Sequence, residues 1–231
     1  MIWIRKANFF LSAIALAYAF SVDAFVGPST SACTGRRIAP LHQENADAPE
    51  GESIETFLQQ NYPLFESLLL QKIPNIYSTL KESDDSDGFT IFCPSNSVME
   101  NVDDKRKVQI SDPRNDEVTE KLAGYHVIAN GKVTQERLKR EDWTVPKVDG
   151  VAALSIGGVL TLSGELRVGR SKSGGFMGFG AKEDGGVVIG NNEAKVVKST
   201  TVGNGVVHEV DGFTAPDLIW RYFDQLRLPG F

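Results

Sequence analysis

Apolar residues recur at helical spacing along the first half of the chain, which predicts that this part is largely helical. The stretch 54–58 follows Ser53, and serine is a residue type that often caps the N-terminus of a helix. Pro63 suits the first turn of a second helix, because residues 64–69 after it carry a single apolar stripe. A further amphipathic stretch covers 116–128. We therefore expect helices that each bury one face.

The second half of the chain alternates between apolar and polar residues, as strands do. Two such runs, 151–156 and 159–163, flank Gly157-Gly158, which predicts a hairpin. Two further pairs of β-prone runs are joined by turn residues at 191–192 and at 203–205. Helices followed by hairpins predict an α+β fold, with helices packed on a largely antiparallel sheet.

The composition is that of a globular protein, because 41% of the 231 residues are hydrophobic and 23% are charged. The formal net charge of −6 hides an asymmetry. Residues 1–42 carry four basic side chains and one acidic side chain, so the remaining chain holds 20 basic and 29 acidic residues, a net charge of −9. Such an acidic body argues against nucleic acid or an anionic membrane surface as the main partner. With Cys33 and Cys93 as the only cysteines, no disulfide framework organises the fold.

Residues 1–24 have the features of a secretory signal peptide. Arg5 and Lys6 precede an apolar stretch over 9–20, and Ala24 suits signal peptidase. The apolar stretch is shorter than the roughly 20 residues that a membrane-spanning helix needs, which favours a cleaved signal over an anchor. We therefore expect no integral membrane anchor after cleavage.

Residues 25–41 contain serine, threonine and arginine but no acidic side chain, which is the composition of a plastid transit peptide. The Ala24-Phe25 junction resembles that of the bipartite leaders of diatoms and other algae with secondary red plastids. Residues 42–52 are polar and predict a linker. The expected destination is the plastid, in the stroma or on the stromal side of the thylakoid. The alternative is a secreted protein whose mature chain begins at Phe25.

A glycine-rich segment interrupts the predicted strands at 171–186. It carries three large apolar residues, Phe176, Met177 and Phe179, between its glycines. A mobile hairpin excursion explains the glycines, whereas a tip that docks on a protein partner also explains the apolar side chains.

Three blocks of the sequence, in order, resemble the signature segments of fasciclin domains. The first is the run 89–99, Phe-Thr-Ile-Phe-Cys-Pro-Ser-Asn-Ser-Val-Met, the second is Tyr-His-Val-Ile at 125–128, and the third is 204–212, which carries a histidine and then Asp-Gly. The resemblance spans 53–226, and Cys93 and Ser95 depart from the residues usual in the family. The matching signature residues are Phe92, Pro94, Asn96, Tyr125, His126, His208 and Asp211.

The resemblance implies a wedge-shaped, non-catalytic module of adhesion and protein interaction. In a plastid it implies an accessory or scaffold component of a plastid or photosynthetic assembly, with protein partners. One alternative is a carrier of an apolar ligand such as a carotenoid, since some algal fasciclin-like proteins resemble carotenoid binders. The other alternative is a secreted cell-adhesion protein.

Few side chains of the body suit catalysis or metal binding. Cys93 and His126 are the residue types of a nucleophile and its base, but each lies inside a fasciclin-like block, which favours structural roles. His208 and Glu209 are neighbours on a predicted strand and point to opposite faces, so they cannot ligate one metal ion. Asp211 is expected to be a turn residue. We expect no enzyme activity, no metal and no cofactor.

The C-terminal segment predicts an amphipathic helix, capped by Thr214 and with Pro216 in its first turn. Its expected core-facing residues are Leu218, Ile219, Tyr222, Phe223 and Leu226. Trp220 falls about 60° outside that stripe, beside Arg221. We expect Trp220, Arg221 and the tail 227–231, which ends in Phe231, to form a partner-binding surface. A tryptophan that covers the edge of its own core is the alternative.

Overall fold

The computed structural model describes residues 46–48, 51–140, 154–155, 158–174, 182–192 and 194–225. These residues belong to one compact unit, Leu41–Phe231. The predicted leader segments 1–24 and 25–41 lie outside the described residues.

Helices dominate the first half of the described chain, as predicted. α1 begins after Ser53, whose hydroxyl accepts the amide N–H of Thr56 at 3.2 Å, and α2 begins at Pro63. The helices are α1 (Ile54–Asn61), α2 (Pro63–Leu68), η1 (Leu70–Lys72), α3 (Ile76–Asp84), α4 (Asn96–Glu100), α5 (Asp104–Ser111), η2 (Pro113–Asn115), α6 (Asp116–Gly124), α7 (Gln135–Arg140) and α8 (Asp217–Gln225).

The helix predicted over 116–128 is too long at its C-terminal end. α6 ends at Gly124, and residues 127–128 form a short strand instead. The reason is tertiary, because Val127 pairs with Ile91 of the neighbouring strand and both are buried. A helical continuation would leave the backbone groups of that buried strand edge unpaired.

One mixed sheet holds the nine strands of the described chain, and the predicted α+β class is confirmed. The strand order is β3-β2-β9-β8-β7-β6-β5-β4, with β1 also paired to β8. Only the pairs β2–β9 and β1–β8 are parallel among the described strands. The strands are β1 (Ala46–Asp47), β2 (Thr90–Pro94), β3 (Val127–Ile128), β4 (Leu154–Ser155), β5 (Gly158–Thr161), β6 (Gly164–Ser173), β7 (Lys182–Ile189), β8 (Ala194–Val202) and β9 (Gly205–Val210).

The predicted hairpins form, but the second strand of the first one begins one residue earlier than predicted, because Gly158 belongs to β5 and not to the turn. Ser155 lies opposite Gly158, Ile189 opposite Ala194, and Val202 opposite Gly205. The last of these is a tight turn, because only two residues separate the paired positions.

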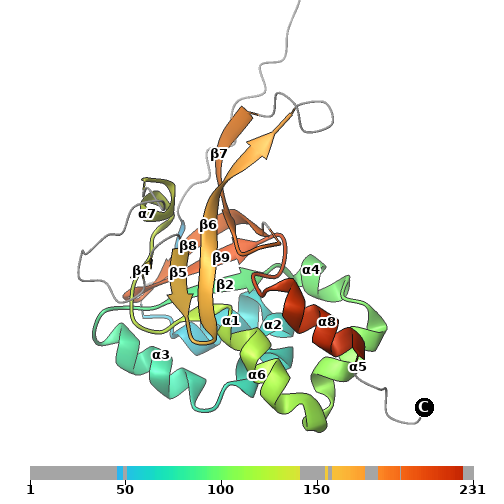
Figure 1. Ribbon diagram of the computed structural model, residues 1–231. Coiled ribbons are helices and arrows are strands. Elements are labelled where there is room, and N and C mark those ends of the chain that lie inside the picture. Colours follow the sequence, from blue (N-terminus) through green and yellow to red (C-terminus); the bar gives the residue numbers. More distant parts are fainter. Residues whose placement is uncertain are drawn as a thin grey trace, which may run out of the picture. The chain divides into compact units, whose positions relative to one another are not determined.

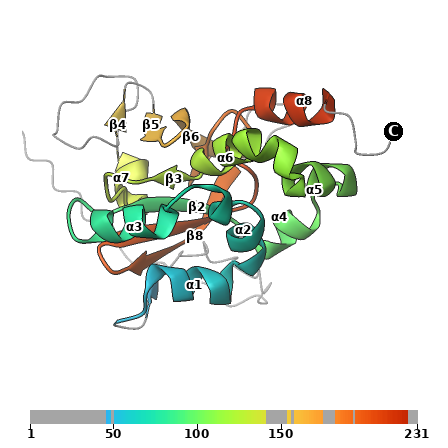
Figure 2. The same ribbon diagram turned by 90° about the horizontal axis from the view of Figure 1, so that it is seen from below.

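The buried strand β2 separates two hydrophobic cores. Ile91 and Cys93 pack into the core formed with the helices, whereas Phe92 packs into the core formed with β5 to β8. This division follows from the alternation of side chains along a strand. Figure 2 shows α1 on one side of β2 and β8, with β4, β5 and β6 on the other. The fully buried β2 is therefore the centre of the fold, and both signature histidines lie against it.

The predicted linker 42–52 contains a strand. Within it, β1 pairs in parallel with β8, and the amide N–H of Ala48 donates to the Thr201 carbonyl at 3.0 Å. Ala48 also packs against the helical core. This part of the segment is therefore part of the folded domain.

Strands occupy the two ends of the glycine-rich segment 171–186. β6 continues to Ser173 and β7 starts at Lys182, so the two strands form a long ribbon (Figure 1). The Nη1 atom of Arg170 donates to the Leu138 carbonyl at 2.7 Å, which ties the ribbon to α7. Phe176, Met177 and Phe179 lie outside the described residues.

Candidate interaction surface

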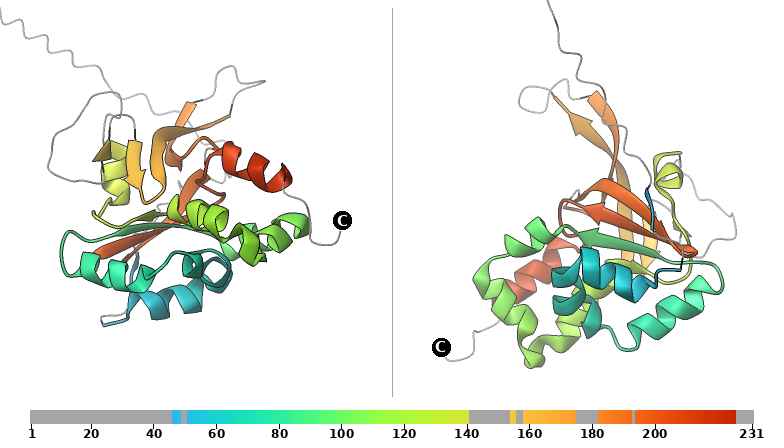
Figure 3. Two further views of the ribbon diagram at one scale, coloured as in Figure 1. Left: turned by 60° about the horizontal axis from the view of Figure 1, so that its bottom comes forward. Right: turned by 180° about the vertical axis from the view of Figure 1, so that it is seen from behind.

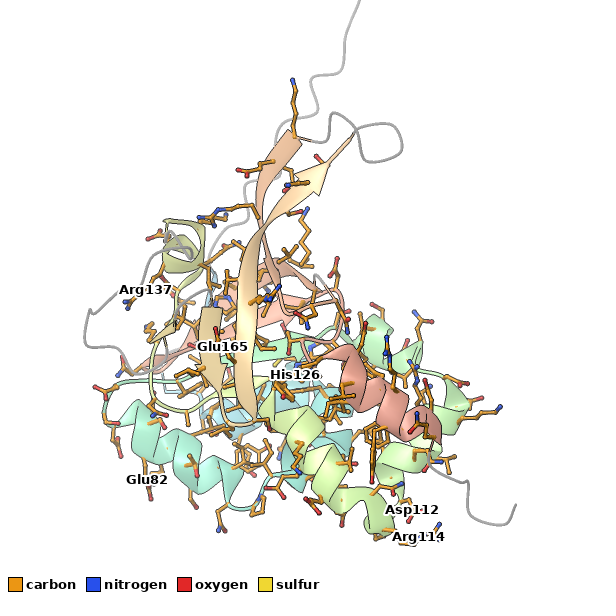
Figure 4. All side chains as sticks on the ribbon, in the orientation of Figure 1. Glu82, Asp112, Arg114, His126, Arg137 and Glu165 are labelled. Carbon is orange, nitrogen blue, oxygen red and sulfur yellow. The ribbon has the colours of Figure 1, made fainter. Side chains whose placement is uncertain are left out.

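His126 holds two signature blocks together inside the protein (Figure 4). Its Nδ1 donates to the Phe92 carbonyl at 2.8 Å, and its ring lies between the rings of Phe65 and Phe213. Complete burial lowers the pKa of His126 to about 4, against a smaller opposing effect of the bond to Phe92. The imidazole is therefore neutral at neutral pH, with its hydrogen on Nδ1.

His208 makes a second buried contact of the same kind. Its Nε2 lies 2.7 Å from the Val133 carbonyl and its Nδ1 lies 2.7 Å from the Ser199 hydroxyl. The ring stacks on Phe92, and burial lowers its pKa to about 4. The neighbouring Glu209 instead accepts a hydrogen bond from the Tyr62 hydroxyl at 3.0 Å. His208 and Glu209 thus serve different contacts, as the strand pattern predicts.

The other signature residues in the described chain also make contacts within the fold. Asn96 donates through Nδ2 to the Asn61 carbonyl at 2.9 Å, and Asp211 accepts the amide N–H of Lys195 at 2.6 Å. Pro94 ends β2, and Tyr125 lies against both cores. These residues stabilise the fold and do not converge on a chemical centre.

Cys93 is fully buried at the centre of the helical core. Burial, and to a smaller extent the carboxylate of Glu209, raise the pKa of its thiol well above the usual value. A thiol held in its neutral form is a poor nucleophile. Within the described residues no group of three or more His, Cys, Asp or Glu side chains is placed to hold a metal ion.

Trp220 is buried, which contradicts its expected place in a partner-binding surface and agrees with the alternative, a tryptophan that covers the edge of its own core. It is 8% exposed, its ring centroid lies 4.8 Å from that of Phe213, and the guanidinium of Arg106 stacks over it at 5.0 Å. Arg106 also binds the Asp224 carboxylate through two hydrogen bonds of 3.0 and 2.9 Å. Arg106 was not singled out from the sequence, because α5 carries few apolar residues and lies far from α8 along the chain.

The orientation of α8 therefore differs from the predicted one. Trp220 and Phe223 face the core, while Leu218 and Tyr222, expected inside, are 73% and 50% exposed. α8 packs beside α5, as Figure 3 shows. Leu218, Arg221 and Tyr222 recur at the spacing of one helix face, and we call them the α8 outer face. Leu226 and Phe231 lie outside the described residues.

Thr214 also has a different role from the predicted one. Its hydroxyl donates to the Tyr125 carbonyl at 3.0 Å and lies 3.2 Å from Nδ1 of His126. Thr214 is buried, and α8 begins three residues later at Asp217. It therefore ties the segment before α8 to the signature block around His126 and does not cap the helix.

The sequence profile of the fasciclin domain matches residues 62–216, which is more than half of the chain. The protein therefore belongs to the fasciclin domain family, and the resemblance inferred from the three blocks is confirmed. Domains of this family are protein-interaction and adhesion modules. β1, α1 and α8 lie outside the matched residues.

A solved structure that the chain matches is a domain pair from the insect cell adhesion molecule fasciclin I, the subject of "Novel Fold Revealed by the Structure of a FAS1 Domain Pair from the Insect Cell Adhesion Molecule Fasciclin I". The two share 16% sequence identity and align with a TM-score of 0.39, over 64% of this chain and 43% of that chain. This chain thus spans less than half of the pair. No curated protein matches the chain. None of the described helices is long and apolar enough to cross a membrane.

Proposed function

We propose that this fasciclin domain is a non-catalytic protein-interaction module of a secondary plastid, where it serves as an accessory or scaffold component of a plastid or photosynthetic assembly. The α8 outer face is its contact surface. The observation that carries this proposal is the exposure of two large apolar side chains, Leu218 and Tyr222, on one face of a helix whose other face is firmly packed. Large side chains of this kind dominate the binding free energy of protein interfaces.

The packing of α8 supports this choice. Phe223 is fully buried, and Arg106 joins α5 to α8 through both Asp224 and the Trp220 ring. A partner that binds the α8 outer face contacts a helix that is already held in place, so little conformational entropy is lost on binding. The burial of three side chains supports the proposal that the domain is non-catalytic. His126, His208 and Cys93 are fully buried, and both histidines make hydrogen bonds within the protein.

Co-purification tests the contact surface. The tagged full-length chain is isolated from gently lysed plastids as the wild type, as Leu218→Ser with Tyr222→Ser, and as a control variant with Leu160→Ser and Val197→Ser. The control residues are also exposed apolar side chains, but they lie on β5 and β8. We expect the α8 variant to lose the companions that the wild type and the control retain.

Retention of the same companions by a folded α8 variant would contradict the proposed surface. The same preparation tests the wider proposal, because elution as a monomer with visible absorption would favour the carotenoid carrier. A mature N-terminus at Phe25 and absence from plastids would favour the secreted adhesion protein.

A further inference from the structure

His126 is in direct contact with the segment that leads into α8. Its ring centroid lies 5.8 Å from that of Phe213, edge to face, and its Nδ1 lies 3.2 Å from the Thr214 hydroxyl. These two residues lie four and three positions before Asp217, where α8 begins. Figure 4 labels His126 near the start of α8. The packing of this histidine therefore helps to position the helix.

The contact continues from Phe213 into α8 itself. The Phe213 ring lies edge to face with that of Trp220, with 4.8 Å between the centroids, and the Phe223 ring follows at 6.0 Å from Trp220. Trp220 and Phe223 are the two side chains that α8 buries. A row of aromatic rings thus connects His126 with the buried side of the helix. Because protein interiors are closely packed, a displacement of Phe213 would remove the support of Trp220.

The second ring nitrogen of His126 has no hydrogen-bond partner in the described chain. Nδ1 donates to the Phe92 carbonyl at 2.8 Å, whereas Nε2 is buried and unpaired there. In the neutral ring Nε2 carries only a lone pair. Protonation adds an N–H and a positive charge to a site bounded by the rings of Phe65 and Phe213. A buried charge without a partner is strongly disfavoured, so a proton bound at Nε2 favours conformations that admit water.

The titratable groups that flank the contacts of His126 are engaged elsewhere. Glu66 of α2 accepts hydrogen bonds from two other side chains, Asp211 accepts a backbone N–H, and the Cys93 thiol of β2 is neutral. The pKa of His126 is shifted by burial, which lowers it, and by the weaker opposing effect of the bond to Phe92. No carboxylate in the described chain is therefore placed to neutralise a protonated His126.

The ion pairs on α8 and on the neighbouring α6 do not titrate between pH 7.5 and pH 5. Arg106 lowers the pKa of Asp224, and Lys121 lowers the pKa of Glu117. Ordinary carboxyl pKa values are near 4, so both carboxylates remain ionised at pH 5. The bonds between α5 and α8 therefore persist at that pH, and a change in α8 reports on its buried side.

We propose that protonation of His126 releases the segment 213–225 from the core, so that proton binding at this buried site regulates the α8 outer face. The inference rests on the proposed function, because release affects binding only if that face is the contact surface. In the docked helix, Leu218, Arg221 and Tyr222 share one fixed face. In the released segment they lose this arrangement, and the partner dissociates. The domain therefore holds its partner at neutral and alkaline pH and loses it near pH 5.

The expected size of the effect follows from the pKa of His126 in the two states. The docked ring has a pKa of about 4, whereas a ring in water has a pKa of about 6.5. Between pH 7.5 and pH 5 the ratio of released to docked molecules then rises by up to about 30-fold. Above about pH 6.5 the ring is neutral in both states, so pH has little effect there.

Hydrogen exchange of the full chain at pH 7.5 and pH 5 tests the proposal without a partner. Peptides over 217–225 report on α8, and peptides over 205–210 report on β9, a central strand. The exchange rates are corrected for the intrinsic effect of pH on amide exchange. At pH 5 we expect the ratio of open to docked α8 to be about 10- to 30-fold above its value at pH 7.5.

Two variants separate release of α8 from unfolding of the whole domain. Asparagine can still donate to the Phe92 carbonyl but cannot take up a proton, so His126→Asn should remove the pH response of α8. His208→Gln is the matched control, because His208 is an equally buried histidine whose contacts, Val133 and Ser199, lie on elements other than α8. It should leave the response of α8 within about twofold of the wild type and reduce that of β9, which opens only with the whole domain.

Three outcomes would overturn the proposal. They are an α8 that opens no more at pH 5 than at pH 7.5, a folded His126→Asn variant that keeps the full pH response, and a His208→Gln variant that reduces the responses of α8 and β9 alike. The first and third outcomes do not depend on the folding of the His126 variant, and thermal melts check both variants. Because exchange involves no partner, failure here would leave the contact surface, which co-purification tests, untouched.

Discussion

The Ser199 hydroxyl donates a hydrogen bond to Nδ1 of His208, with 2.7 Å between the two atoms. The direction follows from the other ring nitrogen, because Nε2 lies 2.7 Å from the Val133 carbonyl and must carry the hydrogen. The neutral imidazole of His208 is therefore part of the core formed with β5 to β8. Protonation would place a second N–H against Ser199 and a charge in an apolar site, which costs free energy.

Acid should therefore destabilise the fold at a pH where most carboxylates are still ionised. Burial lowers the pKa of both His126 and His208 to about 4 in the folded protein, whereas a histidine of the unfolded chain has a pKa of about 6.5. Between these two pH values the unfolded chain therefore binds more protons than the folded protein. Stability is complete above about pH 6.5 and falls as the pH drops toward 4. At pH 5 the loss is about 2 kcal/mol for each histidine.

Urea unfolding at pH 7.5 and pH 5 measures this loss. The paired carboxylates of Asp184 and Asp224 have lowered pKa values, so they titrate below this window. A folded His208→Gln variant should keep about half of the pH dependence. Equal unfolding free energies of the wild type at the two pH values would contradict the prediction.

Replacing Arg106 by alanine should loosen α8. The change removes the two hydrogen bonds to Asp224 and the cation over the Trp220 ring, and both residues of the ion pair are partly exposed. The expected loss of unfolding free energy is about 1–2 kcal/mol. Arg221→Ala is the matched control, since Arg221 is an exposed arginine on α8 itself and its loss should cost less than about 0.5 kcal/mol. Equal effects of the two changes in urea unfolding would show that the Arg106 contacts do not hold α8.

Two glycines of β7 and its following turn should respond differently to alanine. Gly185 and Gly190 both have φ of +76°, so alanine is strained at either position by about 1 kcal/mol. A Cβ at Gly185 meets open space, whereas one at Gly190 would collide with the Thr214 carbonyl. We expect Gly190→Ala to lower the thermal midpoint at least twice as much as Gly185→Ala. Similar midpoints would argue against the close packing of Thr214 on this turn.

Cys93 should be unreactive in the folded protein. Its burial and raised pKa leave little accessible thiolate, so a disulfide reagent should modify it only through unfolding. In a chain that lacks residues 1–41, Cys93 is the only thiol, and its rate of modification should rise with urea in parallel with unfolding. Rapid modification without denaturant would show that the strand end is open to solvent.

Local signals in the sequence were sufficient for the frame of the fold. Three such signals are the Ser53 cap, Pro63 at a helix start and the turn at residues 203–204. Each depends on interactions within a few residues, so it predicts local structure without knowledge of the rest of the chain. The signature blocks also predicted structural roles for His126 and Cys93, and both side chains are fully buried.

The sequence by itself thus determined the α+β class, the hairpins and the family, since these depend on local periodicity and on short blocks of residues. Only the tertiary structure decided which face of α8 is buried. Helical spacing marked Leu218 and Tyr222 as apolar. It could not show that Phe213 packs against Trp220, or that Arg106, 114 positions earlier in the chain, covers the Trp220 ring. Contacts between distant segments decide such choices, because an amphipathic helix with apolar residues around most of its circumference can pack in more than one rotation.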